Sequence, residues 1–160
     1  MNKKVSASAP GKVILFGEHA VVYGRPAIAV PVTQVQATAT VQPGARGLTI
    51  HASDLSRTIT IDPHETTDPL AVAVVSTLRY LEVGLEHNLT IRVESTIPLG
   101  RGFGSSAAVS AAMVRALARY FDVDLPPGEV SRLVYQTEII HHGTPSGVDN
   151  TVIAHARPVY

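Results

Sequence analysis

The sequence predicts an α+β domain, because strand-like and helix-like segments both occur in one chain of 160 residues. Residues 35–41, VQATATV, alternate apolar and polar side chains, as a strand with one buried face does. Residues 105–121 instead carry small or apolar side chains on nearly every face of a helix, which is typical of a buried helix. Hydrophobic residues make up 45% of the chain and charged residues 16%, a composition that suits one globular core. We therefore expect a single domain that spans residues 1–160.

Strands are expected mainly in the first hundred residues. The segment SDLS joins two short β-prone runs and suits a hairpin turn. The first strand region is expected to be broken into two short runs at Pro10 and Gly11. The expected strand segments are residues 4–16, 35–41, 48–52, 57–61 and 88–96, and the chain ends at 157–160 as though entering another strand.

Helices are expected to alternate with the later strands. Asp68 at the N-cap and Pro69 at the first helical position favour a helix that Gly84 closes. Pro126 and Pro127 begin the third expected helix. The expected helices are residues 68–83, 105–121, 126–142 and 144–156.

The charge and composition of the chain exclude several classes of protein. The 13 basic and 13 acidic residues give a formal net charge of +0, which leaves no basic surface for nucleic acid or an anionic membrane. The absence of cysteine excludes disulfides and thiol chemistry and suits a reducing compartment. No signal-peptide core follows the first lysines, and no run approaches the roughly 18 apolar residues of a membrane helix. We therefore expect a soluble cytoplasmic protein with neither nucleic-acid nor membrane partners.

The stretch GRGFGSS, residues 100–106, lies between an expected strand and the helix that begins near Ser105. It lacks the lysine of a P-loop, and its third glycine comes one position too early for the dinucleotide pattern. The first N–H groups of the helix need acceptors, and two interpretations stay open. Ser105 or Ser106 caps them, or a phosphate accepts them, helped by the helix dipole and by glycines that let an anion approach the backbone.

A second cluster of polar side chains lies in the segment APGKVILFGEHAVVYG. Lys12, Glu18 and His19 lie on glycine-containing turns that flank an apolar run, so they could converge on the mouth of one pocket. The alternative is a solvated lysine at a strand edge and a polar turn formed by Glu18 and His19.

A third cluster, TEIIHHGTPSGVDNTV, places two carboxylates near a turn. Glu138 and Asp149 could bind Mg²⁺ and accept a proton from an alcohol. The alternatives are a surface pair between Glu138 and His142 and a capping box between Ser146 and Asp149. The neighbouring His141 and His142 point about 100° apart on a helix, which disfavours a shared zinc ion.

Three longer motifs contain these clusters. Residues 10–24 read PGKVILFGEHAVVYG, residues 98–108 read PLGRGFGSSAA, and residues 142–150 read HGTPSGVDN. The chain thereby resembles the GHMP kinase family, whose second motif is usually written P-x-G-x-G-L-G-S-S-A-A, and within it the mevalonate kinase branch. The resemblance implies the fold of the GHMP kinase N-terminal domain, which is related to ribosomal protein S5 domain 2 and has a mixed sheet packed against helices.

The resemblance also implies an ATP-dependent kinase that transfers the γ-phosphate of ATP to the 5-hydroxyl of mevalonate, in isoprenoid precursor synthesis, with Mg²⁺ as cofactor. Asp149 aligns with the base that takes the hydroxyl proton. Lys12 aligns with the lysine that makes this hydroxyl easier to deprotonate and stabilises developing charge. Ser106 and Glu138 match the residues that bind Mg²⁺ between the β- and γ-phosphates.

The binding residues that the resemblance implies form two groups. Those that line the ATP phosphates are Gly100, Arg101, Gly102, Phe103, Gly104, Ser105 and Ser106. Those that contact mevalonate are Glu18, His19, Tyr23 and Gly147. Phe103 replaces the usual leucine, and Arg101 stands where the family varies, so Arg101 either reaches a phosphate or faces water.

The chain is shorter than members of this family, which continue into a ferredoxin-like second domain with a third glycine-rich motif. We expect an N-terminal-domain fragment, or a naturally short chain that needs the missing C-terminal domain, with exposed apolar surface that favours self-association. The alternatives to an active kinase of this branch are a non-catalytic nucleotide- or substrate-binding module that needs a partner chain, and another GHMP kinase such as phosphomevalonate kinase. A dinucleotide-dependent oxidoreductase is disfavoured, because the chain lacks the glycine spacing that this class requires.

Overall fold

The computed structural model describes residues 3–160, apart from the side chain of His141. Within them, the chain forms a five-stranded sheet in the order β1-β2-β5-β3-β4. Neighbouring strands are antiparallel, except that β3 and β5 are parallel, so the sheet is mixed. The strands are β1 (Val5–Phe16), β2 (Ile28–Pro43), β3 (Leu48–Ala52), β4 (Arg57–Ile61) and β5 (Leu89–Ser95).

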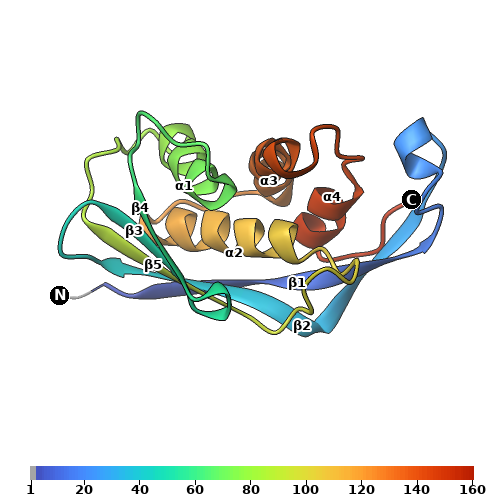
Figure 1. The fold of residues 1–160 in the computed structure, drawn as a ribbon, viewed down its shortest axis with the longest axis horizontal. Coiled ribbons are helices and arrows are strands. Elements are labelled where there is room, and N and C mark those ends of the chain that lie inside the picture. Colours follow the sequence, from blue (N-terminus) through green and yellow to red (C-terminus); the bar gives the residue numbers. More distant parts are fainter. Residues whose placement is uncertain (1–2) are drawn as a thin grey trace.

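The helices cover one face of this sheet (Figure 1). In that view α2 lies directly on the sheet, while α1 and α3 lie farther out and α4 lies beside the first turn of α2. This arrangement confirms the predicted α+β class with a mixed sheet packed against helices. The helices are α1 (Pro69–Tyr80), α2 (Ser105–Tyr120), α3 (Pro127–His142) and α4 (Val148–His155), and the short 3₁₀ turns are η1 (Val21–Tyr23) and η2 (Ser53–Leu55).

Small side chains let α2 lie close to the sheet. Ala108 and Ala112 of α2 and Ala37 and Ala39 of β2 are all fully buried. With only a methyl group on each of these residues, the helix and strand backbones can approach closely while water is excluded. The near-uniform apolar character of the predicted helix therefore reflects burial between the sheet and the outer helices.

The first strand differs from its prediction. β1 runs without a break from Val5 to Phe16, and Pro10 and Gly11 mark a shift in its pairing with β2 instead of an interruption. Proline has no backbone N–H group to donate to the neighbouring strand, and an irregularity in the pairing accommodates this residue. Gly11 and Lys12 are both buried, which breaks the alternation of the strand at the position of the predicted catalytic lysine.

The start of α1 follows its prediction. The Asp68 carboxylate accepts hydrogen bonds from the backbone N–H groups of Leu70 and Ala71, as an N-cap does. The helix ends at Tyr80, before Gly84. The last residues pair as expected, through a bridge between Val159 and Ala29 of β2.

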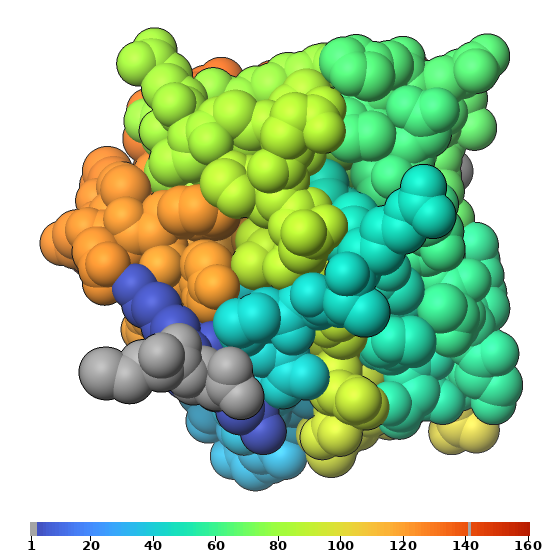
Figure 2. All heavy atoms as spheres, turned by 90° about the vertical axis from the view of Figure 1, so that its left-hand side faces the viewer, coloured from blue at the N-terminus to red at the C-terminus, as the bar shows by residue number. Residues whose placement is uncertain are grey.

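Figure 2 shows the end of the domain at which the described chain begins. Turns and loops cover the ends of the elements there, including the β2–β3 turn in cyan and the segment before β5 in yellow-green. No helix in residues 3–160 is long and apolar enough to cross a membrane.

Candidate active site

The glycine-rich stretch forms the loop that joins β5 to α2. Gly100, Gly102 and Gly104 have φ angles of 67°, 74° and 68°, in the left-handed region that favours glycine. The backbone N–H of Lys12 donates to the carbonyl oxygen of Phe103 at 2.9 Å, which fixes the loop against β1. The sequence thus brings the loop and Lys12 together although almost ninety positions separate them.

The amino terminus of α2 has no side-chain cap. Its N-cap residue is Gly104, and the first helical bond runs from Ala108 N–H to the Gly104 carbonyl at 2.9 Å. The interpretation in which Ser105 or Ser106 caps this end is wrong, because no side chain caps it and the Ser106 hydroxyl donates to Glu138 Oε1 at 2.7 Å. The first N–H groups of the helix are thereby left for another acceptor, which fits the anion interpretation.

Lys12 and Asp149 form an ion pair, with 2.7 Å between Nζ and Oδ1. Lys12 is only 5% exposed, so the interpretation of a solvated strand-edge lysine is wrong. The capping-box interpretation of Asp149 is also wrong, because the N-cap of α4 is Gly147 instead of Ser146, no side chain caps this helix, and the Asp149 carboxylate faces Lys12. A buried cation of this kind needs its partner, because removing one charge leaves the other unpaired in a medium of low dielectric.

Glu138 lies inside the protein, at 2% exposure. Its Oε1 accepts from Ser106, and its Oε2 lies 3.6 Å from His142 Nε2. The pair with His142 therefore exists, but the interpretation of a surface pair is wrong, since only the histidine side chain is largely exposed. A carboxylate buried this deeply and oriented by a serine is suited to binding a cation.

Two cavities share Asp149, the acidic member of the ion pair, in their walls. The first, of about 380 Å³, lies along the glycine-rich loop, and the second, of about 360 Å³, lies beside the α3–α4 turn; Asp149 and His142 line both. From the predicted set, the first is also lined by Gly100, Gly102, Phe103, Gly104, Ser105 and Ser106. From the predicted set, the second is also lined by Glu18, Glu138 and Gly147.

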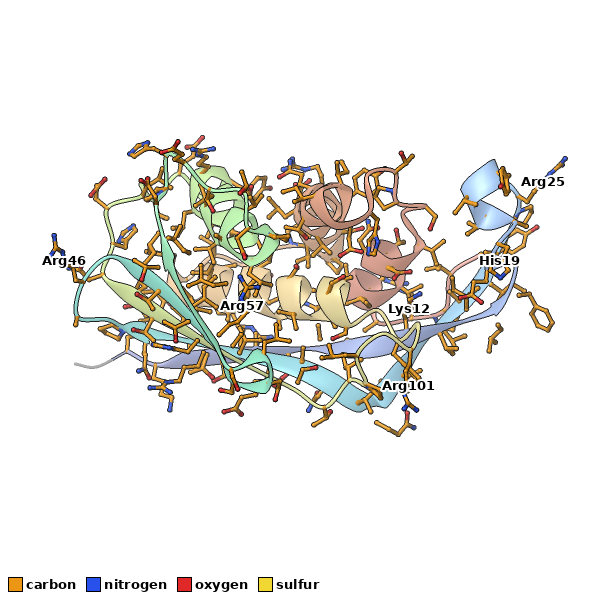
Figure 3. The ribbon with its side chains drawn as sticks, viewed as in Figure 1. Lys12, His19, Arg25, Arg46, Arg57 and Arg101 are labelled. Carbon is orange, nitrogen blue, oxygen red and sulfur yellow. The ribbon has the colours of Figure 1, made fainter. Side chains whose placement is uncertain are left out.

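Four predicted residues line neither cavity: Lys12, which lies buried behind Asp149 in the ion pair, and Arg101, His19 and Tyr23. Tyr23, in η1, is 83% exposed. Figure 3 shows Arg101 pointing away from Lys12 and His19 displaced from Lys12 toward the η1 end of the molecule. Glu18 does approach the loop, because a Cβ at position 102 would lie 4.0 Å from its Oε1.

The oxygen donors of Ser106 and Glu138 fit a magnesium ion better than a zinc ion. Among the residues that the structure describes, no group of three or more His, Cys, Asp or Glu side chains could hold a metal alone. Mg²⁺ usually takes one or two carboxylates and completes its shell with water and substrate phosphates. A hydroxyl and a buried carboxylate beside a candidate phosphate loop match that requirement.

The family model described as GHMP kinases N terminal domain matches residues 70–156, which is more than half of the chain. The chain belongs to the GHMP kinase family. A mevalonate kinase from Thermococcus sibiricus is 38% identical to this chain in sequence. The match covers 94% of this chain and 49% of the length of that relative. The Methanococcus jannaschii mevalonate kinase structure superposes with a TM-score of 0.85 at 26% identity, covering 98% of this chain and 53% of its own. The L. major mevalonate kinase, solved in complex with R-mevalonate, has a TM-score of 0.75 at 28% identity over 98% and 48% of the two chains.

This GHMP kinase chain also uses residues that sequence reasoning did not select. Asn150, next to Asp149, is buried, and its Nδ2 donates to the carbonyl and hydroxyl oxygens of Ser131 at 3.2 and 2.8 Å. These bonds attach α4 to α3. Arg115 of α2 donates to backbone carbonyls of both β1 and α4. A cation in an otherwise apolar stretch is a signal that could have identified Arg115, whereas Asn150 lies among polar residues and has no such signal.

Proposed function

We propose that this chain is the ATP-binding and catalytic half of a mevalonate kinase, which transfers the γ-phosphate of ATP to the 5-hydroxyl of mevalonate. The Lys12–Asp149 ion pair carries this proposal, because Asp149 stands where the two cavities meet. One cavity would hold the nucleotide and the other the alcohol, so that both reactants reach one carboxylate. The similarity to proteins named mevalonate kinase supports mevalonate as that alcohol.

Each of the site residues then has a defined task. The glycine-rich loop and the first N–H groups of α2 bind the phosphates, and Asp149 accepts the proton of the attacking hydroxyl. Lys12 stabilises the negative charge that develops on the transferred group. Ser106 and Glu138 would hold Mg²⁺, which supplies charge neutralisation between the β- and γ-phosphates. The protein contributes alignment and electrostatics, and the chemistry needs no covalent intermediate on the chain.

Glu138→Gln is expected to raise the Mg²⁺ concentration needed for half-maximal phosphoryl transfer by at least about tenfold, because removing the ligand charge weakens the metal site. A Mg²⁺ titration at saturating ATP measures this shift. Glu129→Gln, on the exposed first turn of the same helix, is the control and should leave the titration unchanged. Equal titrations for both variants would contradict the role of Glu138.

The chain spans about half the length of the curated relatives that it matches. We therefore propose that residues 1–160 are the N-terminal domain and that full activity requires a C-terminal domain. Exposed apolar side chains near η1, namely Phe16, Val22 and Tyr23, are available for that contact or for self-association. The alternative is a nucleotide- or substrate-binding module that acts with a partner chain.

A coupled ADP-release assay tests the proposed reaction, with the purified chain alone and with an added C-terminal half of a mevalonate kinase. Mevalonate and Mg·ATP are expected to give turnover at least in the second mixture. Turnover with galactose, homoserine or phosphomevalonate but not with mevalonate would overturn the substrate. Calorimetric binding of ATP or mevalonate without turnover in either mixture would establish the binding module instead.

A further inference from the structure

Arg115 connects three elements of the domain from the middle of α2. Its Nη1 donates to the Ser8 carbonyl of β1 at 3.0 Å. Its Nη2 donates to the Ala154 carbonyl of α4 at 2.7 Å and reaches the Ile153 carbonyl at 3.5 Å. One guanidinium therefore bridges the strand that carries Lys12 and the helix that carries Asp149.

The carbonyl groups of Ile153 and Ala154 lie in the last turn of α4, where no N–H group of the helix itself donates to them. The last four carbonyls of a helix have no intrahelical donor, and α4 ends at His155. A cation at this end also interacts favourably with the helix dipole. The planar fork of an arginine can donate to separate carbonyls at once, which a lysine ammonium does with less geometric control.

Arg115 is half-buried, and these bonds replace part of the water that its guanidinium loses. Desolvation lowers the pKa of Arg115 from its ordinary value, and the neighbouring Arg119 cation lowers it further. A desolvated guanidinium is stable only where acceptors replace its lost water. The carbonyls of β1 and α4 are those acceptors, so the cation holds both elements in place.

We propose that Arg115 is a positioning residue that sets the place of Asp149 relative to Lys12. Asp149 lies four residues before Ile153, about one turn of α4, and Lys12 lies four residues after Ser8 on β1. A rotation or slide of α4 against β1 therefore changes the Lys12–Asp149 geometry directly. The catalytic part of this inference rests on the proposed kinase function, whereas the mechanical part does not.

Arg119 provides a matched control on the same helix. It lies one turn beyond Arg115 and donates to the Ser6 carbonyl of β1 at 3.2 Å, and within residues 3–160 it makes no hydrogen bond to α4. Arg119→Met therefore removes a cation and a helix–strand bond, while Arg115→Met also removes the attachment of α4.

Two measurements test the inference. In the form of the protein that shows turnover, Arg115→Met is expected to lower kcat about 10- to 100-fold with little change in the KM for ATP, because a misplacement near 1 Å has that effect. Arg115→Lys should restore part of the loss, and Arg119→Met should stay within about twofold of the parent. In the free chain, Arg115→Met should speed amide hydrogen exchange of residues 152–155 about tenfold relative to α1, because α4 opens locally.

The outcomes separate this inference from the proposed function. Equal exchange in α4 for Arg115→Met and Arg119→Met overturns the inference, whatever the substrate is. Faster exchange with an unchanged kcat also overturns it, because α4 would then move without affecting catalysis. A parent protein that does not phosphorylate mevalonate overturns the proposed function, while the exchange comparison still decides whether Arg115 holds α4.

Discussion

Asp149→Asn is expected to lower the rate of phosphoryl transfer by about 1000-fold, within the range observed for loss of a general base. Asparagine keeps the size of the side chain and an oxygen that can face Lys12, but it cannot accept the proton of the attacking hydroxyl. The 2.7 Å contact with Lys12 holds the carboxylate in the wall of both cavities, where it can reach the attacking hydroxyl. Single-turnover rates at saturating Mg·ATP measure this loss.

The matched control is Asp122→Asn. Asp122 also pairs with a lysine, Lys3, at 2.6 Å, but its side chain is 83% exposed, against 30% for Asp149. Its removal should leave both the rate and the thermal midpoint nearly unchanged, because exposed ion pairs contribute little. A thermal midpoint for Asp149→Asn close to that of the parent, with the rate unaffected, would show that Asp149 is not the base.

Gly104→Ala is expected to lower the free energy of unfolding by about 2 kcal/mol or more and to weaken ATP binding. An alanine Cβ would lie 2.9 Å from Lys12 Cγ and 3.0 Å from Ile153 Cδ1, so Lys12 or α4 must move. The φ angle of 68° adds backbone strain for a residue with a side chain. Urea unfolding measures the stability, and calorimetry measures the ATP affinity.

Gly100→Ala separates the strain from the crowding. Gly100 has nearly the same φ, 67°, but no heavy atom lies within 4 Å of a Cβ there. This variant should lose only the strain contribution, of about 1 kcal/mol. Equal losses for Gly100→Ala and Gly104→Ala would mean that the close contact with Lys12 has no energetic consequence.

Local signals predicted the parts of the fold that depend on neighbouring residues. The start of α1 follows from Asp68 and Pro69, whose capping geometry is decided within four residues. The glycine turn before α2 follows from the sequence GRGFGSS in the same way, whereas the sequence left open whether a serine caps that helix. Both predictions concern contacts between residues that are close in the chain.

The environment of the charged residues could not be predicted from local sequence. Glu138 is buried, and a hydrogen bond from Ser106, on a different helix 32 positions away, offsets the cost of burying its carboxylate. Lys12 is buried because β1 changes its pairing at Pro10 and Gly11, which alternation alone does not reveal. Burial of a charge depends on partners from distant segments, and single-sequence patterns carry no record of them.

The residues after the first strand show a related difficulty. Glu18, His19 and Tyr23 are close in sequence, yet among them only Glu18 lines the second cavity. Gly17 turns the chain with a φ of 87°, and η1 then carries Tyr23 to the exposed end of the molecule. Turns separate neighbouring side chains in space, so a shared motif did not mean a shared pocket.

The irregular pairing within β1 has a consequence for conformational entropy. It lets Lys12 reach the helix-covered side of the sheet from a strand, where β2 and the glycine-rich loop hold its backbone and Asp149 of α4 holds its side chain. Ordering a long lysine side chain costs on the order of 2 kcal/mol of rotamer freedom. Here that cost falls on the folding of the chain, once, and is absent from each binding event. A cation on a mobile loop would lose the same freedom every time a substrate arrived.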